Sequence, residues 1–281
     1  MLAELRRLVG IGAALLALAF AQSARADAPQ VATVEGVRCS VAYHGAELLH
    51  HGYFPIDVEM LNTGDRAVTV DFKAQQQWQV EDEVTKRLRL EPGERVAFEP
   101  LLRARTNSVN TYAVTFEVNG ESQYFAVGPS EWSGGFEVPV LFASRSPVEA
   151  GAVERWASTW TDRGTGDFRF AAVRFPELSK LWAAYTSYEW VVLSLEQGLP
   201  DAAALDAIFA WVRTGGRLLV IAPNPRAALE SRPQDAKWLS PDYAVRESQP
   251  ERFAAYHCGY GTITLFSAQG WGFEEMESVD G

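Results

Sequence analysis

The feature that most constrains the fold is a strand–helix–strand unit in the C-terminal half of the chain. Trp190–Ser194 and Arg217–Ala222 are short apolar runs, typical of strands buried on both faces. Between them, apolar residues recur at steps of three and four and predict an amphipathic helix: Leu205, Ile208, Phe209 and Val212. Gly215–Gly216 ends this helix, and we expect the first glycine to supply a left-handed C-terminal residue. Strands joined by a crossover helix lie parallel in one sheet, so the unit predicts a helix-covered parallel sheet.

The same alternation extends on both sides of this unit, after the glycine pair Gly134–Gly135. Further strands are predicted at Phe136–Ala143, Phe168–Phe175 and Thr262–Phe266. Helical spacing is found over Val148–Trp160, and Pro176 is expected to open a short helix carrying Leu178, Leu181, Trp182 and Tyr185. We therefore predict a C-terminal α/β flavodoxin-like parallel-sheet domain over residues 136–267.

Residues 31–128 show strand patterns and no helical one. The strongest signal is Asn119-Gly120, which separates two alternating runs, Tyr112–Val118 and Glu121–Val127. Asn-Gly is the preferred two-residue hairpin turn, because both residues must adopt a positive φ. Seven or eight short strands with turns at this spacing predict an N-terminal antiparallel β-sandwich, so the fold class is mixed.

Two further turns give this stretch a resemblance to a known class. They are Asn62-x-Gly64, after an outgoing strand, and Leu90-x-Pro92-Gly93-Glu94. With the closing hairpin, they make residues 31–128 similar to the immunoglobulin-like domains of bacterial exported proteins. The resemblance implies an Ig-like sandwich, and it implies little about activity.

The C-terminal half resembles a different family. Tyr188–Ser194, followed by Ala203–Val220 with its helix–Gly-Gly–strand segment, is similar to the class I glutamine amidotransferase-like superfamily. It resembles above all the noncatalytic members found in exported or membrane-attached bacterial proteins of unknown function. The resemblance covers residues 136–267.

Charge excludes one class of partner. The chain has 25 Lys and Arg against 36 Asp and Glu, a net charge of −11. Because nucleic-acid binding depends on basic side chains that neutralise phosphates, nucleic acid is not an expected partner. An anionic membrane surface is disfavoured for the same reason.

Residues 1–26 have the layout of a secretory signal peptide. Arg6 and Arg7 precede an apolar run, and the segment ends in Ala24-Arg25-Ala26, which predicts cleavage between Ala26 and Asp27. No later segment reaches the roughly 20 apolar residues of a membrane span. The expected location is therefore periplasmic or secreted. Residues 268–281 form an acidic tail, either a solvated end or a docking segment.

The catalytic chemistry of active amidotransferases is missing from the pattern. Such an enzyme needs a cysteine on a strand-to-helix elbow and a downstream His–acid pair. Cys258 is the domain's only cysteine, but Gly259-Tyr-Gly261 and the β-branched Thr262–Phe266 predict a hairpin or bulge that feeds a strand. No histidine follows it. Cys258 and Cys39 are interpreted as buried free thiols, with an interdomain disulfide as the alternative.

Metal and cofactor sites are not indicated either. His44, His50 and His51 lie close in sequence, but no cysteine or well-spaced carboxylate completes a coordination sphere, and a polar loop is the interpretation we favour. Gly164-Thr-Gly166 lacks the Gly-Lys-Ser/Thr of a phosphate loop. We predict no metal and no cofactor.

A ligand site, if present, is expected where parallel strand order reverses. In a 2-1-3-4 order, this crevice lies beyond the carboxyl ends of strands one and three. The candidate ligand-binding residues there are Ser144, Arg145, Ser194, Glu196 and Asn224. The alternative is that these are ordinary polar residues at loop termini.

The chain has nine tryptophans, and a surface on which carbohydrate rings stack is therefore one alternative. Five lie on apolar stripes or strands and are assigned to the core: Trp156, Trp160, Trp182, Trp190 and Trp211. The other four lie in less regular contexts and are better candidates for an exposed contact surface: Trp78, Trp132, Trp238 and Trp271.

Together these features predict an exported, noncatalytic protein that acts by protein–protein or ligand binding, its partner another envelope protein. One alternative is a hydrolase with an unconventional site in the crevice, using Ser194 or Glu196. Another is a receptor for a sugar or small metabolite.

Overall fold

The chain is represented by a computed structural model that describes residues 29–43, 51–76, 83–104, 111–128, 138–145, 168–195, 198–245 and 253–267. It divides into two compact units, one within residues 25–135 and the other from Phe136 onward. The expected leader over residues 1–26, the expected helix Val148–Trp160 and the acidic tail lie outside the described residues.

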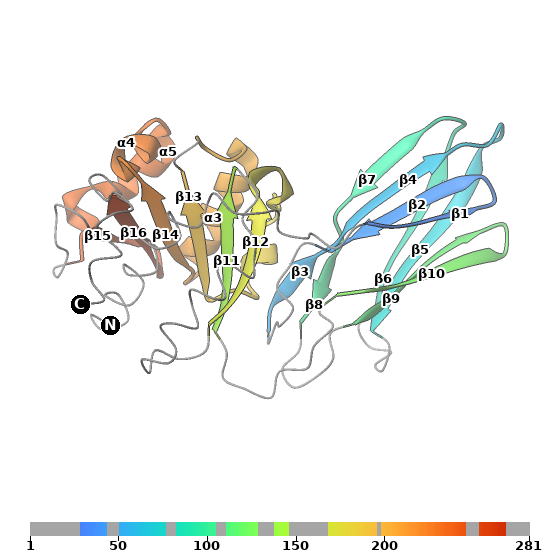
Figure 1. Ribbon diagram of the computed structural model, residues 1–281, viewed down its shortest axis with the longest axis horizontal. Coiled ribbons are helices and arrows are strands. Elements are labelled where there is room, and N and C mark those ends of the chain that lie inside the picture. The colour runs from blue at the N-terminus through green and yellow to red at the C-terminus, as the bar shows by residue number, and fades with distance from the viewer. Residues whose placement is uncertain are drawn as a thin grey trace, which may run out of the picture. The chain divides into compact units, whose positions relative to one another are not determined.

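The first unit consists of antiparallel sheets (Figure 1). Its strand orders are β1-β2-β4-β7 and β10-β9-β5-β6, with β3 and β8 as a separate pair. The strands are β1 (Gln30–Val34), β2 (Val37–Ala42), β3 (Tyr53–Pro55), β4 (Asp57–Asn62), β5 (Val68–Gln76), β6 (Glu83–Leu90), β7 (Arg95–Phe98), β8 (Leu101–Arg103), β9 (Tyr112–Val118) and β10 (Glu121–Val127).

The core of this unit lies between the two larger sheets. Buried and less buried side chains alternate along β5, where Val70, Phe72 and Ala74 point inward. The ring of Phe72 meets that of Phe98 on β7 edge-to-face, with centroids 5.1 Å apart. The apolar faces of the two sheets therefore pack together, and the prediction of antiparallel sheets is confirmed.

The predicted Asn-Gly hairpin is confirmed in detail. Asn119 and Gly120 have φ values of 54° and 89°, and they join β9 to β10 with Val118 opposite Glu121. The strand count was underestimated, since β3 and β8 are three-residue strands too short to show alternation.

The second unit contains a six-stranded mixed sheet of order β12-β11-β13-β14-β16-β15 (Figure 1). Neighbouring strands from β12 to β16 are parallel, so the first four follow the expected 2-1-3-4 order. The strands are β11 (Val138–Ser144), β12 (Phe168–Arg174), β13 (Trp190–Ser194), β14 (Arg217–Ala222), β15 (Phe253–Cys258) and β16 (Gly261–Ser267). The edge strand β15 is antiparallel to β16 and was not predicted, because its sequence, Phe-Ala-Ala-Tyr-His-Cys, lacks a clear period of two.

The helix of the strand–helix–strand unit forms where it was expected. Helix α3 (Ala202–Arg213) begins after Asp201, whose carboxylate accepts a hydrogen bond of 2.7 Å from the Ala203 N–H. At its other end Gly215 has a φ of 124° and donates to the Val212 carbonyl, while Gly216 donates to that of Trp211. This is a Schellman-type C-terminus, so the role predicted for the first glycine is confirmed.

The prediction of one short helix starting at Pro176 is wrong. Two 3-10 turns form instead, η1 (Phe175–Glu177) and η2 (Trp182–Tyr185). They are separated because the Ser179 hydroxyl accepts the N–H of Leu181 at 3.0 Å and competes with helical bonding. As a result, Trp182 is 46% exposed and Leu181 41%, although both were assigned to an apolar stripe and Trp182 to the core.

The remaining helical segments follow β14 and were not predicted. They are α4 (Pro225–Glu230), α5 (Pro233–Ala236), η3 (Lys237–Leu239) and η4 (Pro241–Tyr243). None of the helices in the described ranges has the length and apolar character that a membrane span requires.

Candidate functional site

Two of the predicted site residues meet at the carboxyl edge of the parallel strands. Ser144 is the last residue of β11 and is buried, and Ser194 is the last residue of β13 and is half-buried. Ala143 and Leu193 are paired in register, so the two serines occupy the next matching position on adjacent strands. Their hydroxyls therefore lie on the same face of the sheet.

The other predicted residues take separate roles. Arg145 is exposed, and its Nη1 atom lies 3.6 Å from the position that a Cβ atom on Gly198 would occupy, so it reaches the loop that precedes α3. Asn224 caps α4, because its Oδ1 accepts a hydrogen bond of 3.1 Å from the Ala227 N–H. Glu196 lies outside the described residues. The structure thus brings Ser144 and Ser194 together and gives Asn224 a structural function.

This edge has groups that can hold an anion, and no described histidine of the second unit lies at it. Two hydroxyls and a guanidinium can donate hydrogen bonds to a carboxylate or phosphate. A serine nucleophile needs an imidazole or another base within hydrogen-bonding reach. The described histidines are His51, in the first unit, and His257, which pairs with Thr262 at the amino-terminal end of β16. His257 therefore lies at the opposite end of the parallel strands from Ser194 and cannot activate it.

Cys258 lies on a hairpin, as its sequence context predicted. It ends β15 opposite Gly261, the first residue of β16, and Gly259-Tyr260 form the turn between them. The thiol is fully buried, whereas the preceding His257 is exposed. Adjacent residues of a strand point to opposite faces, so the imidazole and the thiol cannot form a catalytic pair.

The environment of the thiol disfavours its reactive, deprotonated form. Burial raises the pKa of Cys258 to about 11, and the positive charge of Arg213 offsets this only in part. Since the thiolate is the nucleophile, a thiol of this kind is almost wholly protonated at neutral pH. Cys39 is also buried and unpaired, and burial raises its pKa to about 12. The two sulfurs do not form the alternative disulfide.

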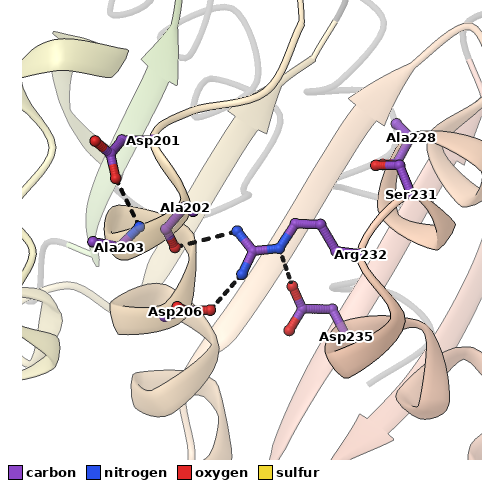
Figure 2. A network of polar contacts seen from close by, with 8 residues as sticks. All are labelled: Asp201, Ala202, Ala203, Asp206, Ala228, Ser231, Arg232 and Asp235. Atoms are coloured by element: carbon purple, nitrogen blue, oxygen red, sulfur yellow. Dashed lines mark hydrogen bonds and ion pairs between the residues drawn. The ribbon is translucent and has the colours of Figure 1, made fainter.

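A buried ion pair lies among the helices of this unit (Figure 2). Arg232 Nε is 2.7 Å from Asp235 Oδ2, and the side chains are 9% and 4% exposed. The same guanidinium donates to the Ala202 carbonyl at 3.2 Å and to the Asp206 carboxylate, both on α3. Burial raises the pKa of Asp235 despite the attraction of Arg232. The pair fastens the segment after β14 to α3, and it presents no open face to a substrate.

The tryptophan assignments are partly confirmed. Trp190 and Trp211 are buried, as expected of core residues. Trp238, a candidate for an exposed surface, is half-buried, with its ring centroid 5.3 Å from that of Tyr243. Trp182 is exposed, as described above. The remaining five tryptophans lie outside the described residues: Trp78, Trp132, Trp156, Trp160 and Trp271. So do His44 and His50, and no metal-binding cluster is found among the residues that are described.

Sequence reasoning missed a cavity at the opposite, amino-terminal edge of the sheet. It has a volume of about 260 Å³, and residues of β13, β14, β15 and β16 line it. These residues are far apart in the sequence and only strand register brings them together. The one signal available beforehand was Thr262-x-Thr264, two hydroxyl side chains on the same face of a predicted strand.

Comparisons with known proteins give no family. No family model and no curated protein matches the chain. An exo-β-1,4-mannosidase from Opitutaceae bacterium strain TAV5 is similar over 47% of this chain and 31% of its own, with 12% identity and a TM-score of 0.29. A cycloisomaltooligosaccharide glucanotransferase from Paenibacillus sp. is similar over 69% and 28%, with 12% identity and a TM-score of 0.29. β-Glucuronidase 2 of Bacteroides uniformis is similar over 67% of this chain and 23% of its own, with 11% identity and a TM-score of 0.22.

The chain spans less than a third of the length of each of these proteins. TM-scores this low do not establish a shared fold.

Proposed function

We propose that this chain is an exported, noncatalytic binding protein of the cell envelope. In this proposal an Ig-like sandwich precedes a flavodoxin-like unit related to class I glutamine amidotransferases, and neither unit carries out amide hydrolysis. The N-terminal sequence supports export to the periplasm or beyond, and the 2-1-3-4 strand order supports the flavodoxin-like topology.

One observation carries the proposal. Both cysteines of the chain are buried in β-strands and neither lies on a strand-to-helix elbow; Cys258 ends the first strand of a hairpin, with its neighbour His257 on the other face. A scaffold whose cysteines are buried in strands can still bind a partner, and binding is the function that we propose for it.

Two exposed side chains at the start of η2, one aliphatic and one aromatic, support contact with another protein. Trp182 and Leu181 are each more than two-fifths exposed, on a segment held in place by the buried ring of Tyr185. Large apolar side chains in such positions are enriched where proteins bind one another.

The proposal is tested with the chain from Asp27 to Gly281. Ammonia release from glutamine and from a peptide amide is measured for the wild type and for Cys258→Ala and Ser194→Ala. We expect all three to match the blank without protein. Ammonia release that either substitution abolishes would overturn the proposal and favour the hydrolase alternative.

Partner binding is tested separately by capture from an envelope extract. We expect the wild-type chain to retain a defined protein in stoichiometric amounts and Trp182→Ala to retain less of it. Tyr124→Ala, at a tyrosine of the first unit that is 49% exposed, is the matched control. Capture of no protein at all would contradict the proposed mode of action.

A further inference from the structure

The cavity at the amino-terminal edge of the second sheet is built by a row of side chains on four adjacent strands. Trp190 pairs with Arg217, Arg217 with Thr262, and Thr262 with His257. Residues in register on neighbouring strands point to the same face, so the four side chains stand next to one another. All four line the cavity.

Two polar groups in this wall can take part in ligand binding. Arg217 forms an ion pair with Glu189, with 3.7 Å between Nη1 and Oε1, and its side chain is 40% exposed, so some of the five N–H donors of the guanidinium remain open to a ligand. Thr264 is 1% exposed and also lines the cavity, and its hydroxyl has no hydrogen-bond partner in the described part of the chain. A buried hydroxyl without a partner is costly, so a ligand that reaches it gains from satisfying it.

Aromatic rings form the rest of the recognition surface. The Arg217 guanidinium lies over the Trp190 ring, 5.4 Å from its centroid, which fixes the cation against the wall of the cavity. Tyr260, at the tip of the β15–β16 turn, also lines the cavity and is 93% exposed.

The turn that carries Tyr260 is held firmly. The Tyr260 N–H donates to the Arg213 carbonyl and the Thr262 N–H to that of Gly216, both at 3.1 Å. A Cβ atom on Gly261 would lie 2.1 Å from the Val212 carbonyl oxygen, so the turn lies directly against the end of α3. The backbone of the turn is thus fixed, so stacking of a ligand on Tyr260 orders only the two side-chain torsions of the ring.

We propose that this cavity binds a small organic carboxylate with a flat aromatic body. Arg217 would hold the carboxylate, Thr264 would supply or accept a hydrogen bond, and Trp190 and Tyr260 would contact the ring. The volume of about 260 Å³ suits a molecule the size of an aromatic acid. The inference rests on the proposed function, because it takes the chain to be a binder and names the class of ligand.

The test is calorimetric titration of the chain from Asp27 to Gly281 with phenylacetate and with its neutral amide, phenylacetamide. We expect saturable binding of the acid, and at least about tenfold weaker binding of the amide, because the amide cannot form a charge-assisted pair with Arg217. No saturable binding of phenylacetate, benzoate or 3-phenylpropionate would overturn the inference.

Two variants locate the binding in the cavity. Arg217→Met keeps the length of the side chain without its charge, and it should weaken phenylacetate binding about tenfold or more. Thr264→Val is close in shape, should fold with an unchanged or higher melting temperature, and should also bind less tightly. Arg89→Met, at an exposed arginine of the first unit that pairs with Glu91, is the matched control and should bind like the wild type. Equal binding by all three variants would place the ligand elsewhere and overturn the assignment.

Recovery of the ligand separates this inference from the proposed function. Phenylacetate that binds and is recovered unchanged by NMR supports both. A bound ligand that is chemically altered, with the change lost in Arg217→Met, keeps the site and overturns the noncatalytic function. Absence of binding, together with absence of ammonia release, overturns the site alone.

Discussion

The thiol of Cys258 links burial to the pH dependence of stability. Burial raises its folded-state pKa to about 11 from an ordinary value of 9.0. The unfolded chain therefore loses this proton at a lower pH than the folded chain does, so the stabilising contribution is complete below pH 9 and falls as the pH rises toward 11.

We expect the free energy of unfolding to fall by about 1.4 kcal/mol more between pH 8 and pH 10 in the wild type than in Cys258→Ala. Urea unfolding of both proteins at the two pH values measures this difference, and other titrating groups cancel in the comparison. Equal slopes for the two proteins would show that the thiol is already ionisable in the folded state.

The residues of the candidate site differ in how well their positions could be predicted from the sequence. The placement of Cys258 on a hairpin could be predicted, because β-branched residues follow it and glycines flank its turn. The end-of-strand positions of Ser144 and Ser194 could be predicted for the same local reasons. The role of Asn224 as a helix cap could not, since α4 is only six residues long and has no amphipathic period.

At the scale of elements, the β15–β16 hairpin packs directly against the end of α3, because Gly261 has no side chain. A Cβ atom on Gly261 would lie 2.1 Å from the Val212 carbonyl oxygen and 2.2 Å from that of Gly216, and neither backbone atom can move freely. We expect Gly261→Ala to lower the free energy of unfolding, measured with urea, by about 2 kcal/mol or more.

Tyr260→Ala is the matched control in the same turn. Its ring is 93% exposed, so the substitution should change the free energy of unfolding by less than about 0.5 kcal/mol. A loss of similar size from both substitutions would contradict the close packing of the turn against α3.

The ion pair between Arg232 and Asp235, which anchors the segment after β14 to α3, leads to a second prediction at this scale. Arg232→Met leaves the Asp235 carboxylate buried without its cation, which should cost roughly 3–5 kcal/mol at pH 7. The loss should be smaller at pH 5, because without Arg232 the pKa of Asp235 rises further and the group becomes neutral more easily.

The double variant Arg232→Met/Asp235→Leu removes both charges and should recover most of that stability. Urea unfolding of the wild type, the single variant and the double variant completes the comparison. A double variant no more stable than Arg232→Met would show that the charge of Asp235 is not the source of the loss.

Elements also differ in how well the sequence predicts them. Strands with a steady alternation or a fully apolar run, such as β9, β10, β13 and β14, could be predicted to the residue, because local burial determines them. The edge strand β15 has no such pattern, and its pairing depends on the tertiary contact with β16. The cavity that we assign to a carboxylate was invisible for the same reason, since strand register alone brings Trp190, Arg217 and Thr264 together.

At the scale of the whole molecule, the chain forms two compact units, and each has its own core of buried apolar side chains. The net charge of −11 disfavours polyanionic partners, while the local pairing of Arg217 with aromatic rings leaves room for a small anion. The central feature of the second unit is its parallel sheet with a buried thiol, Cys258, that has no access to substrate.

The most direct measurement of that claim is the rate at which iodoacetamide labels Cys258 in the native chain at pH 8, followed by mass spectrometry. The buried thiol of a folded hairpin should stay unlabelled over a time in which the urea-unfolded chain is labelled completely. Labelling of Cys258 in the native chain as fast as a free thiol such as glutathione would show that the sulfur is exposed and reactive, and the account would fail.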